Sequence, residues 1–225
     1  MTNAVLVVDM VRGFLEEGYP LYCGNRARRI IPNVQGLLEQ ELARGSTVFF
    51  LCDHHSPDDP EFRMFPLHCL EGTAEAEVIP ELARYRGEVI PKRRFSAFFD
   101  TPLEEKLSQL KPEKLIICGV CTDICVLHTV ADARNRDYKV EVPVDCVASF
   151  DEKAHRFALG YHQKIHKKET FASSLDTIPG IGPKRKRALL KHFGSIQAIR
   201  NTSVEELALT KGMSQSLAQK IKELL

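Results

Sequence analysis

The feature that most constrains this fold is a series of short apolar runs that alternate with helical stretches. Residues Ala4–Val8 and Thr47–Cys52 form two such runs, and residues 115–118 form a third. Runs of this kind are typical of strands buried on both faces of a parallel sheet. Helical spacing appears between them, at 31–43 and 103–110. The alternation predicts an α/β fold, a three-layer, doubly wound and mostly parallel sheet covered by helices.

Ionisable side chains follow the predicted strands. Asp9 and Asp53 end the first two runs, Lys92 follows an extended segment at 88–91, and Cys125 opens the helix after the third run. The carboxyl ends of the strands in an open α/β sheet meet at one edge, where ligands bind. We therefore expect these four side chains to converge.

Cys125 is the candidate nucleophile. The stretch Gly119–Val126 leads from a strand into the start of a helix, and the positive end of a helix dipole stabilises a thiolate there. Asp9 could accept the thiol proton, and Lys92 could favour the charged form. The alternatives are a buried apolar cysteine and a solvated lysine within the basic run 92–94.

A second cluster lies in and beside the loop at 54–73. Loops this long within a compact domain are usually functional. Asp53, His55, Glu61 and His68 supply two carboxylates and two imidazoles, a set that suits one divalent ion, Zn²⁺ first and Mn²⁺ or Fe²⁺ otherwise. No generic zinc motif has this spacing.

Three phenylalanines, Phe14, Phe65 and Phe99, lie near these polar positions in the sequence. They are candidates for an aromatic wall that binds a flat ring substrate. The alternative is an ordinary role in the hydrophobic core.

Over about residues 1–155 the chain resembles the nicotinamidase/pyrazinamidase branch of the isochorismatase-like cysteine hydrolases. The matching segments are Val7–Phe14, Asp53–His55, Glu61–Phe62, Phe65–Thr73, Lys92–Phe98 and Gly119–Val126. The second, third and fourth segments form one metal-loop motif, so the chain holds four motifs in order, and such a set is specific. Two positions depart from the family pattern: Glu61 stands where many members have His, and Cys121 stands where Ala is usual.

The resemblance implies a catalytic triad of Asp9, Lys92 and Cys125. Cys125 would attack the carboxamide carbon of nicotinamide, and hydrolysis of the thioester would give nicotinate and ammonia, a step of NAD salvage. A cis peptide before Cys121 would aim the N–H groups of Cys121 and Cys125 at the oxyanion. The metal of this branch binds the pyridine nitrogen and orients the substrate.

The end of the chain has a different character. Residues 1–150 hold 17 Lys/Arg and 23 Asp/Glu, whereas residues 176–225 hold 9 and 4. Glycine turns precede predicted helices at 185–193 and 215–225, and 204–209 is a further predicted helix. Glycine turns that open onto helices can bind phosphate, and lysines add attraction to nucleic acid. The alternative is a small helical bundle with solvated lysines.

Residues 174–225 resemble the tandem helix-hairpin-helix domain of the excision-repair nuclease subunit UvrC. The two hairpins are 179–182 and 211–214. The resemblance implies non-specific contact with the DNA backbone, through Gly180, Gly182, Lys184, Lys211 and Gly212. We place the hydrolase domain at 1–168 and this helical domain at 169–225. The resemblance to the hydrolase family implies a further strand after the helix that begins at Asp151, but no apolar run follows that helix, so the sheet is expected to lack its last strand.

Seven cysteines, several of them in apolar runs, indicate reduced thiols in a cytoplasmic protein. No apolar run reaches the roughly 18 residues of a membrane span, and no signal-peptide pattern is present. A homo-oligomer is compatible with the sequence. Two other functions stay open: hydrolysis of another small amide, and a DNA-repair accessory with a vestigial hydrolase domain. The intact triad residues argue against the second.

Overall fold

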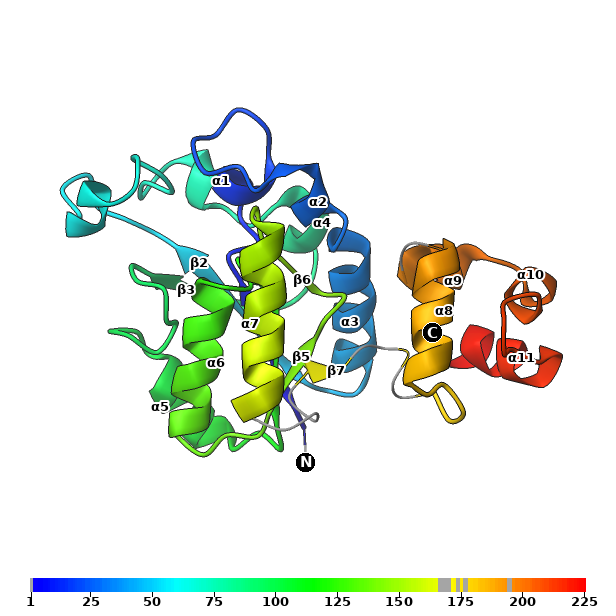
Figure 1. The fold of residues 1–225 in the computed structure, drawn as a ribbon. Helices are drawn as coiled ribbons and strands as arrows, with labels where there is room; N and C mark the ends of the chain where they lie inside the picture. The colour runs from blue at the N-terminus through cyan, green and yellow to red at the C-terminus, as the bar shows by residue number, and fades with distance from the viewer. Residues whose placement is uncertain (1, 166–170, 173–174, 176–177, 194–195) are drawn as a thin grey trace.

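The computed structural model describes residues 2–165, 171–172, 175, 178–193 and 196–225. A larger α/β domain is followed by a smaller helical one (Figure 1). No helix of the described residues is both long and apolar enough to span a bilayer.

The centre of the larger domain is a seven-stranded sheet in the order β3-β2-β1-β4-β5-β7, with β6 beside β4. Every strand pair in it is parallel. This confirms the predicted doubly wound α/β fold. The strands are β1 (Ala4–Val8), β2 (Thr47–Asp53), β3 (Glu88–Lys92), β4 (Leu115–Val120), β5 (Val140–Pro143), β6 (Val147–Ala148) and β7 (Phe171–Ala172).

Helices cover both faces of the sheet, so the domain has three layers. One hydrophobic cluster joins one face of β1 to the helix α3 (Ile31–Ala43), including Val34 and Leu38. The other cluster joins the opposite face of β1 to the helices α5 (Leu103–Leu110) and α6 (Cys125–Asn135), including Leu107 and Val130. The helices of this domain are α1 (Arg12–Leu15), α2 (Gly24–Arg28), α3 (Ile31–Ala43), α4 (Pro80–Ala83), α5 (Leu103–Leu110), α6 (Cys125–Asn135) and α7 (Glu152–Ile165), with two short 3₁₀ turns, η1 (Pro60–Arg63) and η2 (Ala74–Ala76).

The helix at α7 begins where the sequence predicts. The Asp151 carboxylate accepts hydrogen bonds from the backbone N–H groups of Lys153 (2.7 Å) and Ala154 (3.0 Å), as a helix cap does. The sequence predicts that this helix runs to about His166, a residue that lies outside the described ones.

The expectation that the last strand is missing is wrong. β7 pairs in parallel with the end of β5, Phe171 opposite Val142. The strand is only two residues long, so it leaves no apolar run that a sequence pattern could reveal.

Glycine is required where β1 and β4 meet. Gly119 has a φ of 115° and pairs with Val8 in the sheet register. A Cβ at position 119 would overlap the Val8 carbonyl oxygen. A larger residue would therefore separate the two strands at the point where they carry Asp9 and the turn before Cys125.

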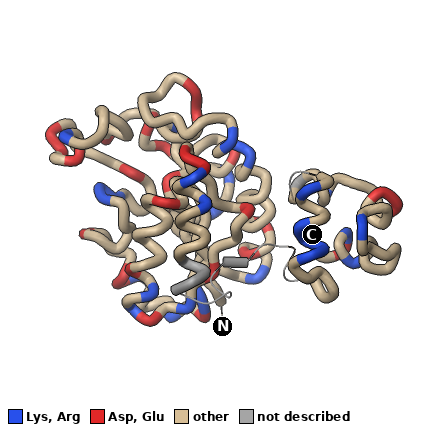
Figure 2. The backbone as a smooth tube through the Cα atoms, in the orientation of Figure 1, with Lys and Arg blue, Asp and Glu red and all other residues tan. Residues whose placement is uncertain are grey.

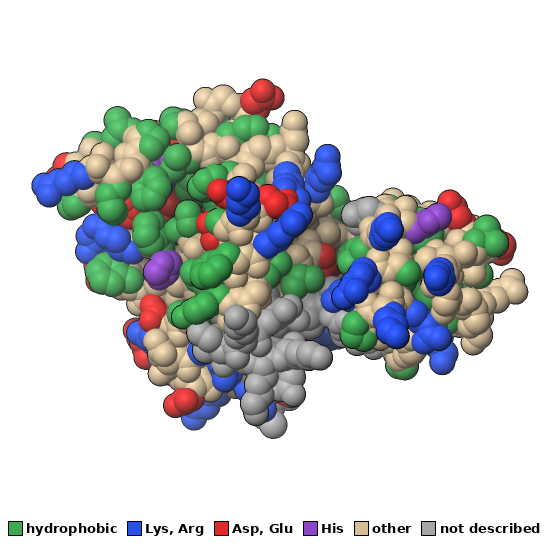
Figure 3. All heavy atoms as spheres, viewed as in Figure 1, with side chains coloured by type: hydrophobic (Ala, Val, Ile, Leu, Met, Phe, Trp, Pro, Cys, Tyr) green, Lys and Arg blue, Asp and Glu red, His purple; other side chains and the backbone are tan. Residues whose placement is uncertain are grey.

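The helical domain has its own core, formed by residues that include Leu189, Ile199, Leu207 and Ile221. Ser203 and Ser214 cap two of its helices through their hydroxyl groups. Figure 2 marks several Lys and Arg positions along the helix α8 (Pro183–Phe193). Figure 3 shows Lys and Arg side chains on the face of this domain that is turned to the viewer. Its helices are α8 (Pro183–Phe193), α9 (Ile196–Asn201), α10 (Val204–Ala208) and α11 (Gln215–Leu224).

Candidate active site

The sheet register brings Asp9, Lys92 and Cys125 into contact. Lys92 Nζ lies 2.8 Å from Asp9 Oδ2 and 3.7 Å from Cys125 Sγ. Lys92 also forms a short ion pair with Asp53, which faces it across the β2–β3 pair. All four side chains are buried. The predicted convergence at the carboxyl edge of the sheet is therefore present.

The backbone around these side chains is unusual. Asp9 has a left-handed conformation with a φ of 51°, which Asp tolerates better than most residues. The Val120–Cys121 peptide bond is cis, in agreement with the resemblance. Cys125 is the first residue of α6, so its N–H has no acceptor within the helix and is available to an oxyanion.

Burial, together with the nearby Asp53 carboxylate, raises the pKa of Asp9 to about 6, although Lys92 and a hydrogen bond with Cys125 lower it. Burial also opposes ionisation of Asp53, but Lys92, His55 and His68 outweigh it and lower the pKa of Asp53. Burial opposes the charge on Lys92 as well, yet Asp53 and Asp9 raise the pKa of Lys92 well above its usual value. Asp9 is therefore mostly ionised at neutral pH and can accept a proton.

The state of Cys125 differs from the expectation of a resting thiolate. Burial raises the pKa of Cys125 well above its usual value, and Asp9 and Asp53 raise it further against the opposing effect of Lys92. Loss of solvent and the two carboxylates outweigh the ammonium group of Lys92. The thiol consequently keeps its proton until a reaction removes it.

Beside the triad lies the predicted metal-ligand group. Asp53, His55, Glu61 and His68 are all buried, and one potential ligand atom from each lies within 4.8 Å of the others. Asp53 ends β2, Glu61 is in η1, and the two histidines are in the loop around it. The Nε2 atoms of both histidines lie 3.5 Å from Asp53 Oδ2.

Hydrogen bonds on the far side of each imidazole orient it toward this group. His55 Nδ1 lies 3.2 Å from Asp59 Oδ2, and His68 Nδ1 lies 2.8 Å from the Pro66 carbonyl oxygen. Outer partners of this kind fix the ring nitrogen that faces a metal. Among the described residues, His55 Nε2 and Glu61 Oε2 are buried without a hydrogen-bond partner. The donor set therefore fits a divalent cation.

Sequence reasoning missed Asp59 and Arg94, which support this group. Asp59 accepts a hydrogen bond from the Glu61 backbone N–H (2.9 Å) and one from Arg94 (2.8 Å). Its position four residues after His55 was the available signal. Through these contacts one carboxylate holds both His55 and the turn that carries Glu61.

Cys125 of the triad and three of the candidate ligands, Asp53, Glu61 and His68, line one cavity of about 230 Å³. Its wall is mainly apolar, and Phe14 and Phe65 are part of it, as predicted. Phe99 is not among its lining residues: its side chain is 50% exposed and lies against the Arg93 guanidinium. The cavity is lined by Phe14, Pro20, Leu21, Tyr22, Cys23, Asp53, Glu61, Phe65, His68, Phe95, Cys121, Ile124, Cys125 and Phe150.

Phe95 takes the place expected for Phe99. It lines the cavity and meets Phe65 edge-on, with ring centroids 6.0 Å apart. Phe95 and Phe99 both follow Lys92 in the same short segment, and no periodic pattern distinguishes the one that faces the cavity.

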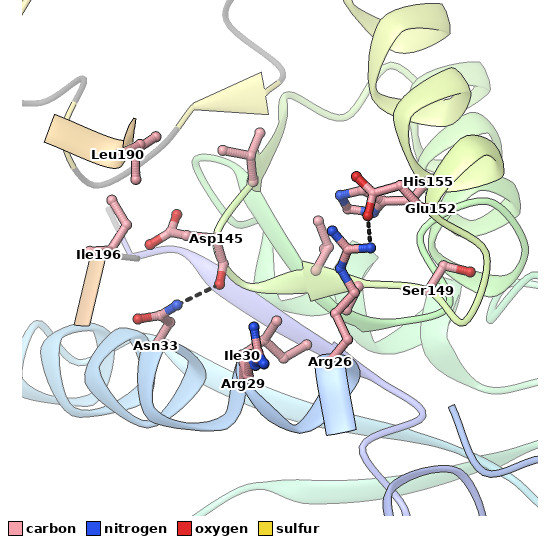
Figure 4. Close-up of a pocket in the computed structure, with 13 residues that line it drawn as sticks. Arg26, Arg29, Ile30, Asn33, Asp145, Ser149, Glu152, His155, Leu190 and Ile196 are labelled. Carbon is pink, nitrogen blue, oxygen red and sulfur yellow. Dashed lines mark hydrogen bonds and ion pairs between the residues drawn. The ribbon is translucent and has the colours of Figure 1, made fainter. Parts of the chain in front are cut away.

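A second and larger cavity, of about 300 Å³, lies between the two domains (Figure 4). Two contacts join its lining residues: Arg26 pairs with Glu152, and the Asn33 side chain donates to the Asp145 carbonyl oxygen (2.8 Å). Neither the triad nor the ligand group lines it. The chemistry therefore belongs to the smaller cavity.

The residues predicted to contact DNA lie in two adjacent exposed hairpins. Gly180 and Gly212 have left-handed backbones, with φ of 99° and 85°, and Gly182, Lys184 and Lys211 are exposed beside them. Arg185 donates to the carbonyl oxygens of Gly180 (2.9 Å) and Gly212 (2.6 Å). One arginine thus connects the two hairpins.

Comparison with known proteins agrees with both halves of this description. The family model described as the isochorismatase domain matches residues 3–170, and the one described as the SAM-like helix-hairpin-helix tandem matches residues 172–225. The uncharacterized isochorismatase family protein PncA of Bacillus subtilis is 34% identical over 172 residues, 72% of this chain and 94% of that protein. The UvrABC system protein C of Symbiobacterium thermophilum is 55% identical over 74 residues, 33% of this chain but only 12% of that protein.

Three solved structures share the fold of the larger domain. Nicotinamidase PncA from Bacillus subtilis has a TM-score of 0.70 at 34% identity and covers 77% of this chain and 100% of its own. N-carbamoylsarcosine amidase from Thermoplasma acidophilum has a TM-score of 0.70 at 32% identity, with coverage of 80% and 100%. Pyrazinamidase of Pyrococcus horikoshii in complex with zinc has a TM-score of 0.69 at 26% identity, with coverage of 77% and 98%.

Proposed function

Because the chain belongs to the isochorismatase family of hydrolases, we propose that it is a nicotinamidase that forms nicotinate and ammonia through a Cys125 thioester. The observation that carries the proposal is one cavity shared by two groups of side chains. Cys125, beside Asp9 and Lys92, lines this cavity together with three of the four candidate metal ligands.

The protein groups account for each proton in the reaction. Asp9 takes the thiol proton as Cys125 Sγ attacks the carboxamide carbon, and the N–H groups of Cys121 and Cys125 hold the oxyanion. Asp9 then returns the proton to the departing ammonia. In the second half, Asp9 accepts a proton from the water that cleaves the thioester and returns it to the departing Cys125 thiolate, which restores the resting thiol. Lys92 stays charged throughout and balances Asp9.

The aromatic side chains of the cavity suit a flat ring. Phe14, Phe65 and Phe95 present apolar surface next to the triad, and apolar burial of a pyridine ring supplies binding energy without a specific hydrogen bond. Asp53, His55, Glu61 and His68 would hold one divalent ion, which would orient the ring by binding its nitrogen. Zinc is favoured, with manganese and iron as alternatives, and the zinc complex of the Pyrococcus horikoshii relative supports that order.

A second candidate is hydrolysis of another small amide. The similarity to N-carbamoylsarcosine amidase favours it, because a protein of the same fold is named for a substrate that has no aromatic ring. The apolar, phenylalanine-lined wall favours nicotinamide.

We also infer non-specific DNA binding by the helical domain. The helix-hairpin-helix match and the exposed hairpin residues support it. A DNA-repair accessory with an inactive front domain is the alternative, and the assembled triad argues against it. Binding should weaken steeply as salt rises.

The test is ammonia release from nicotinamide by the metal-loaded full-length chain, with and without a chelator. We expect activity that the chelator removes and that Cys125→Ala abolishes. Cys146→Ala, which removes another buried thiol outside the cavity, should remain active. Release from N-carbamoylsarcosine with none from nicotinamide would transfer the assignment to the second candidate.

A further inference from the structure

Two thiols touch in the wall of the reactive cavity. Cys23 Sγ and Cys121 Sγ are 3.4 Å apart, although 98 residues separate them in the chain. Both residues line the cavity that Cys125 also lines. Among the described residues, this is the one place where two cysteine sulfur atoms lie within hydrogen-bonding distance.

Neither thiol is used by the proposed reaction. Only the backbone N–H of Cys121 has a role there, and Cys23 has none. Cys23 is held in place by its own contacts: its N–H donates to the Phe14 carbonyl oxygen (2.8 Å) and its thiol contacts the Leu21 carbonyl oxygen (3.5 Å). The two sulfur atoms are therefore held together by well-packed segments of different parts of the chain.

We propose that Cys23 and Cys121 form a reversible disulfide under oxidation, and that this disulfide switches the active site off. The two thiols are 3% and 8% exposed, but they face a cavity that admits small molecules. A hydroperoxide of the size of H₂O₂ can reach them by the route the substrate uses.

The chemistry balances with a hydroperoxide as the oxidant. The thiolate of one cysteine attacks the peroxide oxygen, becomes a sulfenic acid and releases water or alcohol. The second thiol then attacks the sulfenic sulfur, the S–S bond forms, and the hydroxyl leaves as water. The two sulfurs together lose two electrons, which the hydroperoxide gains. A dithiol reductant reverses the reaction.

The effect on activity follows from the position of Cys121, and this part rests on the proposed function. A disulfide needs the sulfur atoms about 2.05 Å apart, so they must close from 3.4 Å. That movement pulls on the residue whose N–H is aimed at the oxyanion. A misplacement of about 1 Å in a catalytic group can cost about 100-fold in rate, so we expect a loss of that order.

The first experiment detects the bond without any activity. The full-length chain is treated with H₂O₂, blocked with an alkylating reagent, digested with trypsin and analysed by mass spectrometry. Trypsin leaves Cys23 on the peptide 13–26, and Cys121 on the peptide 115–134 together with Cys118 and Cys125. Fragmentation of the linked pair identifies the partner. We expect Cys23 linked to Cys121, with the pair lighter by two hydrogen atoms.

Variants assign the bond. The link should persist in Cys125→Ser, which removes the other reactive thiol of the cavity, and in the control Cys146→Ala. It should disappear in Cys23→Ser. A link between Cys121 and Cys125, or no link at peroxide levels that oxidise Cys125, would overturn the proposal.

The second experiment measures the switch as the ratio of amidase activity after oxidation to that before it. Because peroxide also attacks Cys125, the oxidant here is diamide and the recovery is measured with dithiothreitol. We expect the ratio to fall about 100-fold in the wild type and to stay near one in Cys23→Ser. An unchanged ratio in a fully linked protein would refute the switch. A protein that links but hydrolyses no amide would refute the proposed function alone.

Discussion

Removal of the Asp59 carboxylate should weaken metal binding without touching a ligand. Asp59 contacts the Nδ1 atom of His55 (3.2 Å), caps the η1 turn through the N–H of Glu61 (2.9 Å) and accepts from Arg94 (2.8 Å). In Asp59→Ala, His55 loses the partner that orients it and Glu61 loses the cap of its turn. Two of the four candidate ligands are loosened by one substitution.

The magnitude follows from these contacts. Loss of an outer partner of a metal-bound histidine typically costs 10–100-fold in metal affinity, which corresponds to about 1.4–2.7 kcal/mol. Because Asp59 supports two ligands, we expect Asp59→Ala near the upper value. Asp59→Asn keeps an acceptor for the imidazole and for the Glu61 N–H but loses the charge, so we expect about tenfold. The lost turn cap should cost about 1 kcal/mol of stability in the metal-free protein.

The assay is competition for Zn²⁺ between the full-length protein and a chromophoric chelator. Asp58→Ala is the matched control, because Asp58 is the exposed neighbour and its carboxylate contacts only the exposed Ser56 hydroxyl among the described hydrogen bonds. A Zn²⁺ affinity of Asp59→Ala within twofold of that of Asp58→Ala would refute the reasoning, whether both variants bind as tightly as the wild type or both bind more weakly.

Three further predictions follow from other contacts. Phe95→Ala should raise KM for nicotinamide about tenfold, through loss of part of the ring's apolar contact, whereas Phe99→Ala, outside the cavity, should leave KM unchanged in steady-state assays. Glu41→Gln should destabilise the fold by about 1.5 kcal/mol at pH 7 in urea titrations, because the buried carboxylate accepts hydrogen bonds from Asn3 (2.9 Å), Ser46 (2.7 Å) and Arg44 (2.7 Å). Burial opposes ionisation of Glu41, but these bonds lower its pKa. The difference in unfolding free energy between wild type and Glu41→Gln is therefore complete above the unfolded pKa of about 4.3 and must shrink as the pH falls through the lower folded pKa. A difference that grows in acid would contradict this. Arg185→Ala should weaken DNA binding in fluorescence anisotropy more than Arg187→Ala does, since both remove one charge but Arg185 also joins the hairpins; equal losses would assign its role to charge alone.

The sequence was sufficient for the parts of the fold that depend on continuous patterns. Buried parallel strands leave apolar runs, and α3 and α5 leave helical spacing, so these elements occur where they were predicted. Short elements leave no such pattern: β7 has two residues and α1 has four. Their positions depend on partners elsewhere in the chain, such as the end of β5 for β7.

The candidate site likewise contains some residues that the sequence could place and others that it could not. Strand ends are fixed by sheet register, so Asp9, Asp53 and Lys92 could be brought together in advance. Phe95 and Phe99 could not be distinguished, because a loop after a strand has no period that assigns one side chain to the cavity. The contact of Cys23 with Cys121 was equally out of reach, since it joins a loop to a turn 98 residues away. The protonation of Cys125 depends on the sum of burial and three charges, which requires distances.

Asp53 makes the two parts of the site one electrostatic unit. Its carboxylate pairs with Lys92 through one oxygen and lies 3.5 Å from the Nε2 atoms of both histidines through the other. Lys92 in turn lies between Asp53 and Asp9, 2.8 Å from the latter. Asp53 and Asp9 compete for the Lys92 ammonium group. A change in charge on the imidazoles therefore changes the strength of the ion pair between Asp53 and Lys92, and with it the share of the ammonium charge that acts on Asp9. Because the pKa of Asp9 is raised by Asp53 and lowered by Lys92, the basicity of the proton acceptor for Cys125 is set partly by the ligand group. The orientation of the ring and the removal of the thiol proton are consequently coupled through a single carboxylate.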